Sequence, residues 1–164
     1  MTAPADPLIQ FRGVHKAFGP KVIYRGLDFA ITRGETVTIL GASGSGKSVM
    51  LKMLIGLLSP DRGEIVFDGK DVAQMDDRAL DEVRRRIAYL FQGAALFDSL
   101  TVGENVAYGL REQHWKTMAD EAIQQRVAES LAAVGLPGIE DMRPSDLSGG
   151  MKKRVGLART LALH

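Results

Sequence analysis

Several features that would point to common classes of protein are missing from this sequence of 164 residues. It has no cysteine, which excludes a disulfide framework and any metal site built on thiolates. Its most apolar stretch, VMLKMLIGLL at residues 49–58, has about half the length of a membrane span and is interrupted by Lys52. The N-terminal MTAPADPLIQ has neither a cationic start nor a long apolar segment, so we expect no signal peptide.

A strong net charge is also missing. The 21 lysines and arginines nearly balance 20 aspartates and glutamates, and the formal net charge is +1. The chain as a whole therefore has no bulk attraction for nucleic acid or an anionic membrane. Nucleic acid is not an expected partner, and any site for an anion must be local.

The first half of the chain alternates strand-like and helical segments, and its length fits one domain, with or without a subdomain. Residues 8–19 and 27–32 are expected to form strands joined through a turn at Gly19 and Pro20. The β-branched run ETVTIL at 35–40 predicts a buried strand, and residues 47–58, apolar on nearly all sides, predict a buried helix. IVFDG at 65–69 and IAYLFQ at 87–92 are again strand-like.

Helical patterns dominate after Gln92. Asp76 already predicts the N-cap of one helix, and Thr101 with Glu104 forms a capping box ahead of another. Ser148 predicts the N-cap of the last helix, whose inner face would carry Met151, Val155, Ala158 and Ala162. We expect a β subdomain with an α/β core at 1–92, a helical subdomain at 93–145, and a final helix at 146–164 that returns to the core.

The most informative motif is GASGSGKS at residues 41–48, which matches the phosphate-binding loop pattern between a predicted strand and a predicted helix. The glycines allow backbone conformations in which successive N–H groups face one point, at a helix N-terminus with a partial positive charge. Lys47 adds a full charge for the β- and γ-phosphates, and the Ser48 hydroxyl can bind Mg²⁺. The residues expected to hold the nucleotide phosphates are Gly41, Ser43, Gly44, Ser45, Gly46, Lys47, Ser48 and Val49.

A second glycine turn, LSGG at residues 147–150, precedes a basic helix near the end of the sequence. A serine hydroxyl, two glycine N–H groups and a helix N-terminus form another possible seat for an anion. The nearby Lys152, Lys153 and Arg154 oppose the helix dipole, which a negative ligand or partner would offset. An ordinary serine-capped helix with a solvated basic face explains the same residues, and for this motif taken alone it is the favoured interpretation.

Taken together, the phosphate loop, an aromatic strand ending in Gln92, and LSGG about a hundred residues later resemble the nucleotide-binding domain of ABC-type ATPases. The resemblance runs from about residue 8 onward. It implies an α/β P-loop NTPase fold with an antiparallel β subdomain, a parallel-sheet core and a helical subdomain. It also implies ATP and Mg²⁺ as cofactors and a head-to-tail dimer, with ATP held between the phosphate loop of one copy and the LSGG turn of the other.

The same resemblance assigns roles to individual residues. Phe18 matches the aromatic that stacks on adenine, although a strand-end core residue is an equal alternative. Gln92 matches the glutamine that reaches Mg²⁺ and the attacking water, so Lys47 and Gln92 are the expected catalytic residues and Ser48 and Gln92 the expected metal ligands. Ser148, Gly149 and Gly150 match the signature turn, while Met151 departs from the glutamine that is commonest after it.

The run LFQGAALFDSLTVGENVAYGLRE, with Met after LSGG, is similar to the ATPase subunit of Mla-type transporters. These pair with MCE-domain proteins and move phospholipid or another lipid. The resemblance implies an integral membrane permease as partner and a cytoplasmic position on the inner face of a bacterial plasma membrane. Leu96 and Phe97 are candidate contacts to the permease, with the core of the helical subdomain as the alternative.

Residues for hydrolysis are missing, because no acidic residue follows residue 150. The family places a Mg²⁺-binding Asp and a general-base Glu at the end of a later strand, between 37–40 and 87–91 in the parallel sheet. IVFD ending at Asp68 imitates such a strand, but its closing Gly69 favours a hairpin. We therefore expect this polypeptide to bind ATP weakly and to turn it over negligibly, since general-base catalysis contributes about 10²- to 10⁴-fold.

Four functions remain open at this point. The first is the ATP-binding part of a lipid transporter. A soluble ABC ATPase outside transport, a nonhydrolytic nucleotide-binding or regulatory module, and a small-molecule P-loop kinase are the alternatives, the last disfavoured by LSGG.

Overall fold

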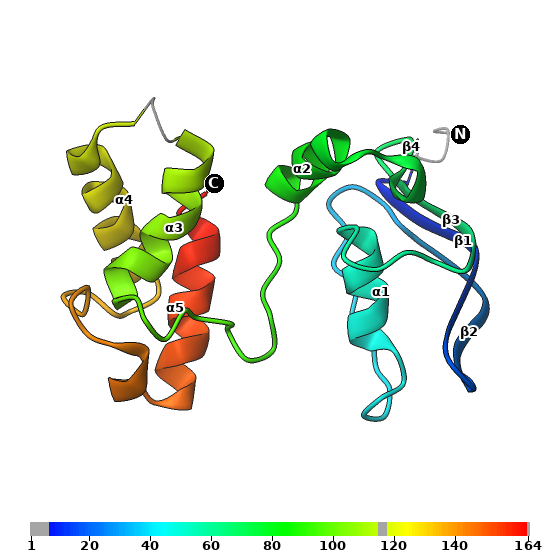
Figure 1. Cartoon of the computed structure of the whole chain (residues 1–164), viewed down its shortest axis with the longest axis horizontal. Coiled ribbons are helices and arrows are strands. Elements are labelled where there is room, and N and C mark those ends of the chain that lie inside the picture. Colours follow the sequence, from blue (N-terminus) through cyan, green and yellow to red (C-terminus); the bar gives the residue numbers. More distant parts are fainter. Residues whose placement is uncertain (1–6, 115–117, 164) are drawn as a thin grey trace. The chain divides into compact units, whose positions relative to one another are not determined.

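A computed structural model describes residues 7–114 and 118–163 (Figure 1). The chain divides into two compact units, one up to Ile87 and one from Ala88 onward. Each unit has its own hydrophobic core. In the described ranges no helix is both long enough and apolar enough to cross a membrane.

The first unit is built on a four-stranded antiparallel sheet of order β2-β1-β3-β4. Its strands are β1 (Ile9–Phe18), β2 (Lys21–Ile31), β3 (Arg62–Phe67) and β4 (Lys70–Asp71). Strands β1 and β2 form the predicted hairpin, whose last paired residues are Phe18 and Lys21. Asp68 and Gly69 join β3 to β4, and Phe67 pairs with Lys70, which confirms the hairpin interpretation of IVFDG.

Two α-helices accompany this sheet, α1 (Lys47–Leu54) and α2 (Asp77–Arg86), with a short 3₁₀ turn η1 (Val72–Gln74) before α2. The predicted cap is present, because an Asp76 carboxylate oxygen accepts a hydrogen bond of 2.8 Å from the Ala79 N–H. Helix α1 is shorter and less buried than predicted. Met53 is 1% exposed and faces the core, but Leu51 is 43% exposed, so the helix buries one face and not all of them.

The two runs predicted as parallel strands, residues 35–40 and 87–92, are not strands in the described structure. A parallel strand forms by exchanging hydrogen bonds with neighbouring strands. None of the paired strands among the described residues lies beside either run. Leu40 is accordingly 89% exposed. The α/β class, the antiparallel subdomain and the helices are confirmed, whereas the parallel part of the sheet is not formed here.

The second unit is a bundle of three helices, α3 (Val102–His114), α4 (Asp120–Ala133) and α5 (Gly149–Leu161), which pack against one another (Figure 1). A 3₁₀ turn, η2 (Pro144–Asp146), leads into α5. Val106, Leu131 and Val155, one from each helix, are fully buried in the shared core. The inner face predicted for the last helix is therefore confirmed, and it packs within this unit.

Side-chain hydrogen bonds fix the start of α3. The Thr101 N–H donates to Glu104 at 2.7 Å and the Glu104 N–H donates to the Thr101 hydroxyl at 3.2 Å, so the predicted capping box is present. Asn105 is 0% exposed, and its amide oxygen accepts a bond of 2.7 Å from the Phe97 N–H. Its amide nitrogen donates to the carbonyls of Phe97, Leu100 and Thr101. One side chain thus holds the loop at 97–101 closed.

Candidate nucleotide-binding site

The phosphate loop at residues 41–46 leads directly into α1 in the first unit. Gly44 and Gly46 have φ angles of 77° and 104°, which residues with a Cβ adopt only at a cost. The Val49 and Met50 N–H groups already donate to the Gly46 carbonyl, so the helix begins at the last residue of the loop. In the described structure the Lys47 and Ser48 N–H groups, ahead of these two, have no such backbone partner. Together with the glycine loop they form the kind of donor surface that binds anions.

The ammonium group of Lys47 lies over its own loop. Its Nζ donates to the carbonyl oxygens of Gly41 at 2.6 Å and Ala42 at 2.9 Å, with the Ser45 hydroxyl at 3.5 Å. In the part of the chain that the structure describes, no carboxylate forms an ion pair with Lys47. The full charge is held at the loop by neutral acceptors, which leaves it uncompensated.

Strand β2 supports the loop from behind. The Tyr24 hydroxyl donates a 2.7 Å hydrogen bond to the Gly46 carbonyl. Burial raises the pKa of Tyr24, so this hydroxyl remains neutral and a donor at physiological pH. A methyl group placed on Gly46 would lie 2.6 Å from Ile23 Cγ2 and 2.8 Å from the Tyr24 oxygen. Glycine is therefore required at this position for space as well as for backbone conformation.

Two further predicted residues of this unit lie at accessible positions. Ser48 is exposed in the first turn of α1, where a hydroxyl can reach a bound cation. The Phe18 ring is 45% exposed at the end of β1, which argues against the core alternative and leaves the ring accessible. The Lys16 ammonium lies 5.3 Å from the ring centroid.

The LSGG turn belongs to the second unit and starts α5. The Ser148 hydroxyl accepts a 3.2 Å hydrogen bond from the Met151 N–H, which confirms it as the N-cap, and Gly149 and Gly150 are exposed. Arg154 is committed elsewhere, because its guanidinium donates to the carbonyls of Val134 and Gly135 at 3.2 Å each. The turn and its two lysines remain available to an external anion.

Gln92 is exposed and lies in a turn at 92–95 instead of at a strand end. The next residues are unusual, since Ala94 and Ala95 have φ angles of 63° and 46°. Arg159 of α5 donates to both of their carbonyls, at 2.7 Å from Nη2 to Ala94 and 2.8 Å from Nη1 to Ala95. Burial lowers the pKa of Arg159. Sequence reasoning missed this residue, since an arginine in a basic helix looks like part of a solvated face.

Changing Arg159 to Gln is expected to lower the free energy of unfolding of the second unit by about 1–2 kcal/mol. The change removes two charge-assisted hydrogen bonds that hold Ala94 and Ala95 in left-handed conformations. Relaxation of these alanines recovers part of the loss, which keeps the expected effect small. Urea unfolding followed by circular dichroism measures the effect. Arg111→Gln, on the exposed face of α3, is the matched control for loss of one positive charge. Equal stability of the two variants would show that the Arg159 bonds contribute nothing.

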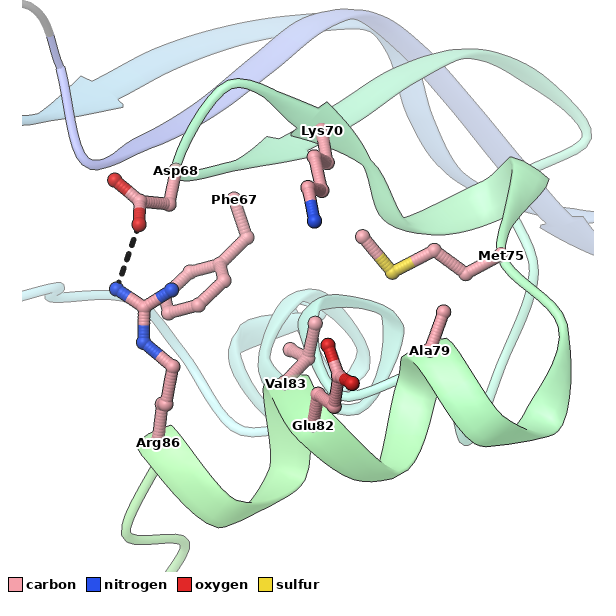
Figure 2. A pocket seen from close by; sticks show the side chains of 8 residues that line it. All are labelled: Phe67, Asp68, Lys70, Met75, Ala79, Glu82, Val83 and Arg86. Carbon is pink, nitrogen blue, oxygen red and sulfur yellow. Dashed lines mark ion pairs between the residues drawn. The ribbon is translucent and has the colours of Figure 1, made fainter.

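Asp68 ends the run IVFD, which resembles a metal-binding strand end in the sequence. In the structure its carboxylate forms ion pairs with two arginines. Asp68 pairs with Arg86 of α2 at 2.7 Å (Figure 2), and Arg33 approaches its other oxygen at 3.1 Å. The hydrogen bond from Arg86 is the main cause that lowers the pKa of Asp68. The Arg86 guanidinium also lies 4.8 Å from the centroid of the Phe67 ring. Throughout the described residues, no three His, Asp or Glu side chains gather as a metal site.

Leu96 and Phe97, the two candidate contacts to a permease, have different surroundings in the structure. Leu96 packs against the core of the second unit. Phe97 is 43% exposed, and its ring lies 4.7 Å from that of Tyr108, which is equally exposed. Phe97 and Tyr108 thus form a small exposed aromatic pair, while Leu96 follows the core alternative.

Comparison with known proteins supports this picture. Residues 24–164 match the family model described as ABC transporter. The chain is 49% identical to TRIGALACTOSYLDIACYLGLYCEROL 3 of Arabidopsis thaliana, covering 96% of this chain and 45% of the relative. It is 46% identical to the probable ribonucleotide transport ATP-binding protein mkl of Mycobacterium bovis, over 98% and 44%. It is 42% identical to the intermembrane phospholipid transport system ATP-binding protein MlaF of Haemophilus influenzae, over 95% and 58%.

The chain spans about half the length of these curated relatives. Among solved structures, the dimeric ATP-binding cassette MJ0796 in a post-hydrolysis state, bound to ADP and Pi, matches with a TM-score of 0.86 and 34% identity. That match covers 94% of this chain and 69% of the cassette. The phosphate loop, the serine-capped LSGG helix and these matches agree, and the chain belongs to the ABC transporter ATP-binding family.

Proposed function

We propose that this chain is the nucleotide-binding part of a transporter ATPase and that it binds ATP at the phosphate loop. The observation that carries the proposal is the Lys47 ammonium held over a glycine loop at the start of α1, without a carboxylate partner in the described ranges. Gly41, Ser43, Gly44, Ser45, Gly46, Ser48 and Val49 complete the proposed phosphate contacts. Phe18 would stack on the base.

The residues present suit Mg²⁺ bound together with ATP. Mg²⁺ keeps several waters and binds mainly through substrate phosphates in nucleotide sites, so few protein ligands are needed. Ser48 offers one exposed hydroxyl at the helix start, and Gln92 is the second proposed ligand. The ion would neutralise phosphate charge, while the loop and Lys47 orient the phosphates.

Ser148, Gly149 and Gly150 are proposed to meet the ATP of a second copy of the chain. Their support is the exposed, serine-capped start of α5 with Lys152 and Lys153 in its first turns. A polyphosphate there would offset the unfavourable position of these cations at the positive end of the helix. The dimeric state of the MJ0796 cassette agrees with this assembly.

Negligible hydrolysis is proposed for the polypeptide of these 164 residues on its own. No Asp or Glu follows residue 150, and Asp68 is occupied by arginines. Gln92 and Lys47 can orient water and phosphate, but neither serves as a strong general base. The activity of a longer protein containing these residues would depend on groups supplied elsewhere.

We propose phospholipid or another lipid as the transported substrate, which would pass through a separate integral membrane permease. The proposal rests on the similarity to MlaF and on the exposed pair Phe97 and Tyr108, which suits an apolar partner. An MCE-domain protein and a position on the inner face of the plasma membrane belong to the same proposal. The mkl relative is named as a probable ribonucleotide transport protein, which makes ribonucleotide transport the second candidate.

Changing Lys47 to Ala is expected to weaken binding of Mg·ATP by at least about tenfold, because one charge-assisted contact to phosphate contributes about 1.5–3 kcal/mol. Isothermal titration calorimetry measures the dissociation constant, and released phosphate is followed in the same samples. Lys52→Ala, an exposed lysine of the same helix, is the control and should bind like the wild type.

Two results would contradict these proposals separately. Equal affinity of Lys47→Ala and wild type would place ATP binding elsewhere. Steady phosphate release by the wild type that disappears in Lys47→Ala would refute negligible hydrolysis and leave the binding site intact.

A further inference from the structure

We infer that Lys21 is a second phosphate-binding cation of this site. The inference rests on the proposed function, since it assumes that the loop at 41–46 holds the phosphates of a nucleotide. It adds a residue outside both glycine motifs, on a different element of the first unit.

The hairpin of β1 and β2 brings Lys21 to the loop. Lys21 is the first residue of β2 and pairs across the turn with Phe18. Its side chain extends to the phosphate loop, where a methyl group placed on Gly44 would lie 3.7 Å from the Lys21 Nζ. The same short hairpin end therefore presents an exposed aromatic ring and an ammonium group.

The charge of Lys21 is not neutralised in the described structure. Lys16, on the same hairpin, shows the contrast, because its ammonium is bound to Asp61 at 2.9 Å and its side chain is 13% exposed. Lys21 is exposed and forms no ion pair with a described carboxylate. Its ammonium group is free to meet an anion that enters the loop.

Lys21 and Lys47 thus bring two positive charges to one glycine loop, both without a described carboxylate partner. Like charges at a shared site repel, and the repulsion is relieved when an anion binds between or beside them. A chain of phosphates with several negative charges suits this pair better than a single carboxylate. The expected ligand class is a nucleoside di- or triphosphate.

The test compares the full chain with Lys21→Gln, Lys21→Arg and Arg25→Gln in calorimetric titrations with Mg·ATP. Arg25 lies four residues along the same strand and is exposed, so Arg25→Gln controls for loss of one positive charge. We expect Lys21→Gln to bind about fivefold more weakly, as suits one partly solvated charge-assisted contact. Lys21→Arg should stay within about twofold of wild type, because it retains the charge.

A second readout separates direct phosphate contact from an effect on folding. Affinity should fall less steeply with added salt in Lys21→Gln than in wild type, since one ionic contact is lost. Thermal unfolding of the variants confirms that each is folded. If Lys21→Gln is destabilised, titrations at a temperature where this variant remains folded, together with the salt dependence of its affinity, still decide the question.

The outcomes distinguish failure of the proposed ATP site from failure of the proposed role of Lys21. If the wild-type chain binds no Mg·ATP, the proposed function fails and the inference fails with it. If the wild type binds and Lys21→Gln binds as well as Arg25→Gln, the role of Lys21 is refuted while the ATP site stands. A loss in Lys21→Gln that Lys21→Arg restores supports the inference.

Discussion

Changing Gly46 to Ala is expected to weaken Mg·ATP binding by about a hundredfold or more, the largest effect predicted for the site. Two costs act together. A residue with a Cβ at φ 104° carries about 1–3 kcal/mol of backbone strain. Its methyl group would also lie 2.6 Å from Ile23 and 2.8 Å from the Tyr24 oxygen, and overpacking of this kind costs about 1–3 kcal/mol. The loop must shift to relieve both, which disperses the donors that face the phosphates.

Gly34→Ala is the matched control for this experiment. Gly34 also has a left-handed φ, 81°, but a methyl group there would meet nothing within 4 Å. The control therefore carries the backbone strain without the clash and without the phosphate loop. Calorimetric titration should detect normal ATP affinity in Gly34→Ala and little in Gly46→Ala. Similar affinities in the two variants would mean that the loop geometry described above is not required for binding.

Changing Asn105 to Ala is expected to lower the free energy of unfolding of the second unit by about 3 kcal/mol. The substitution leaves the Phe97 N–H and several carbonyls of the loop at 97–101 without their partner. Each buried polar group left unsatisfied costs about 1–3 kcal/mol, although water entering an opened loop recovers part of this. Asn105 is 0% exposed in the present structure, so recovery requires the loop to move.

Chemical denaturation followed by far-UV circular dichroism measures this effect. Ser130→Ala is the control, because Ser130 is the other buried polar residue of the described helical unit and makes one hydrogen bond, to the Arg126 carbonyl. We expect the control to lose about 1 kcal/mol or less. A loss in Asn105→Ala no larger than in Ser130→Ala would show that the loop is held by other contacts.

Local signals in the sequence predicted the elements that depend on local chemistry. Asp76, Thr101 and Ser148 cap helices as their residue types indicate, because each cap needs only an N–H group within three residues. The hairpin turn at Gly19 and Pro20 and the short hairpin at Asp68 and Gly69 were predictable for the same reason. Hydrophobic spacing likewise predicted the buried face of α5.

Features that depend on distant partners were not predictable in this way. The run at 35–40 has every local property of a buried strand, yet Ile39 and Leu40 are exposed because no described strand pairs with it. The sequence did not predict the contacts of Arg159 and Lys21, because the residues next to a basic side chain do not indicate which distant group it will meet. Their roles depend on the Ala94 and Ala95 carbonyls and on Gly44, which are far away in sequence.

Helix α5 carries both the LSGG turn and Arg159. Ser148 caps its start, and Arg159, eleven residues later, donates hydrogen bonds to the carbonyls of the two alanines that follow Gly93. At 1.5 Å per residue the two points lie about 16 Å apart along the axis. A helix bends little over three turns, so a displacement of the LSGG end would also move the segment after Gln92. Mechanically, α5 is a stiff connection between the glycine turn at its start and the loop that Arg159 holds near its end.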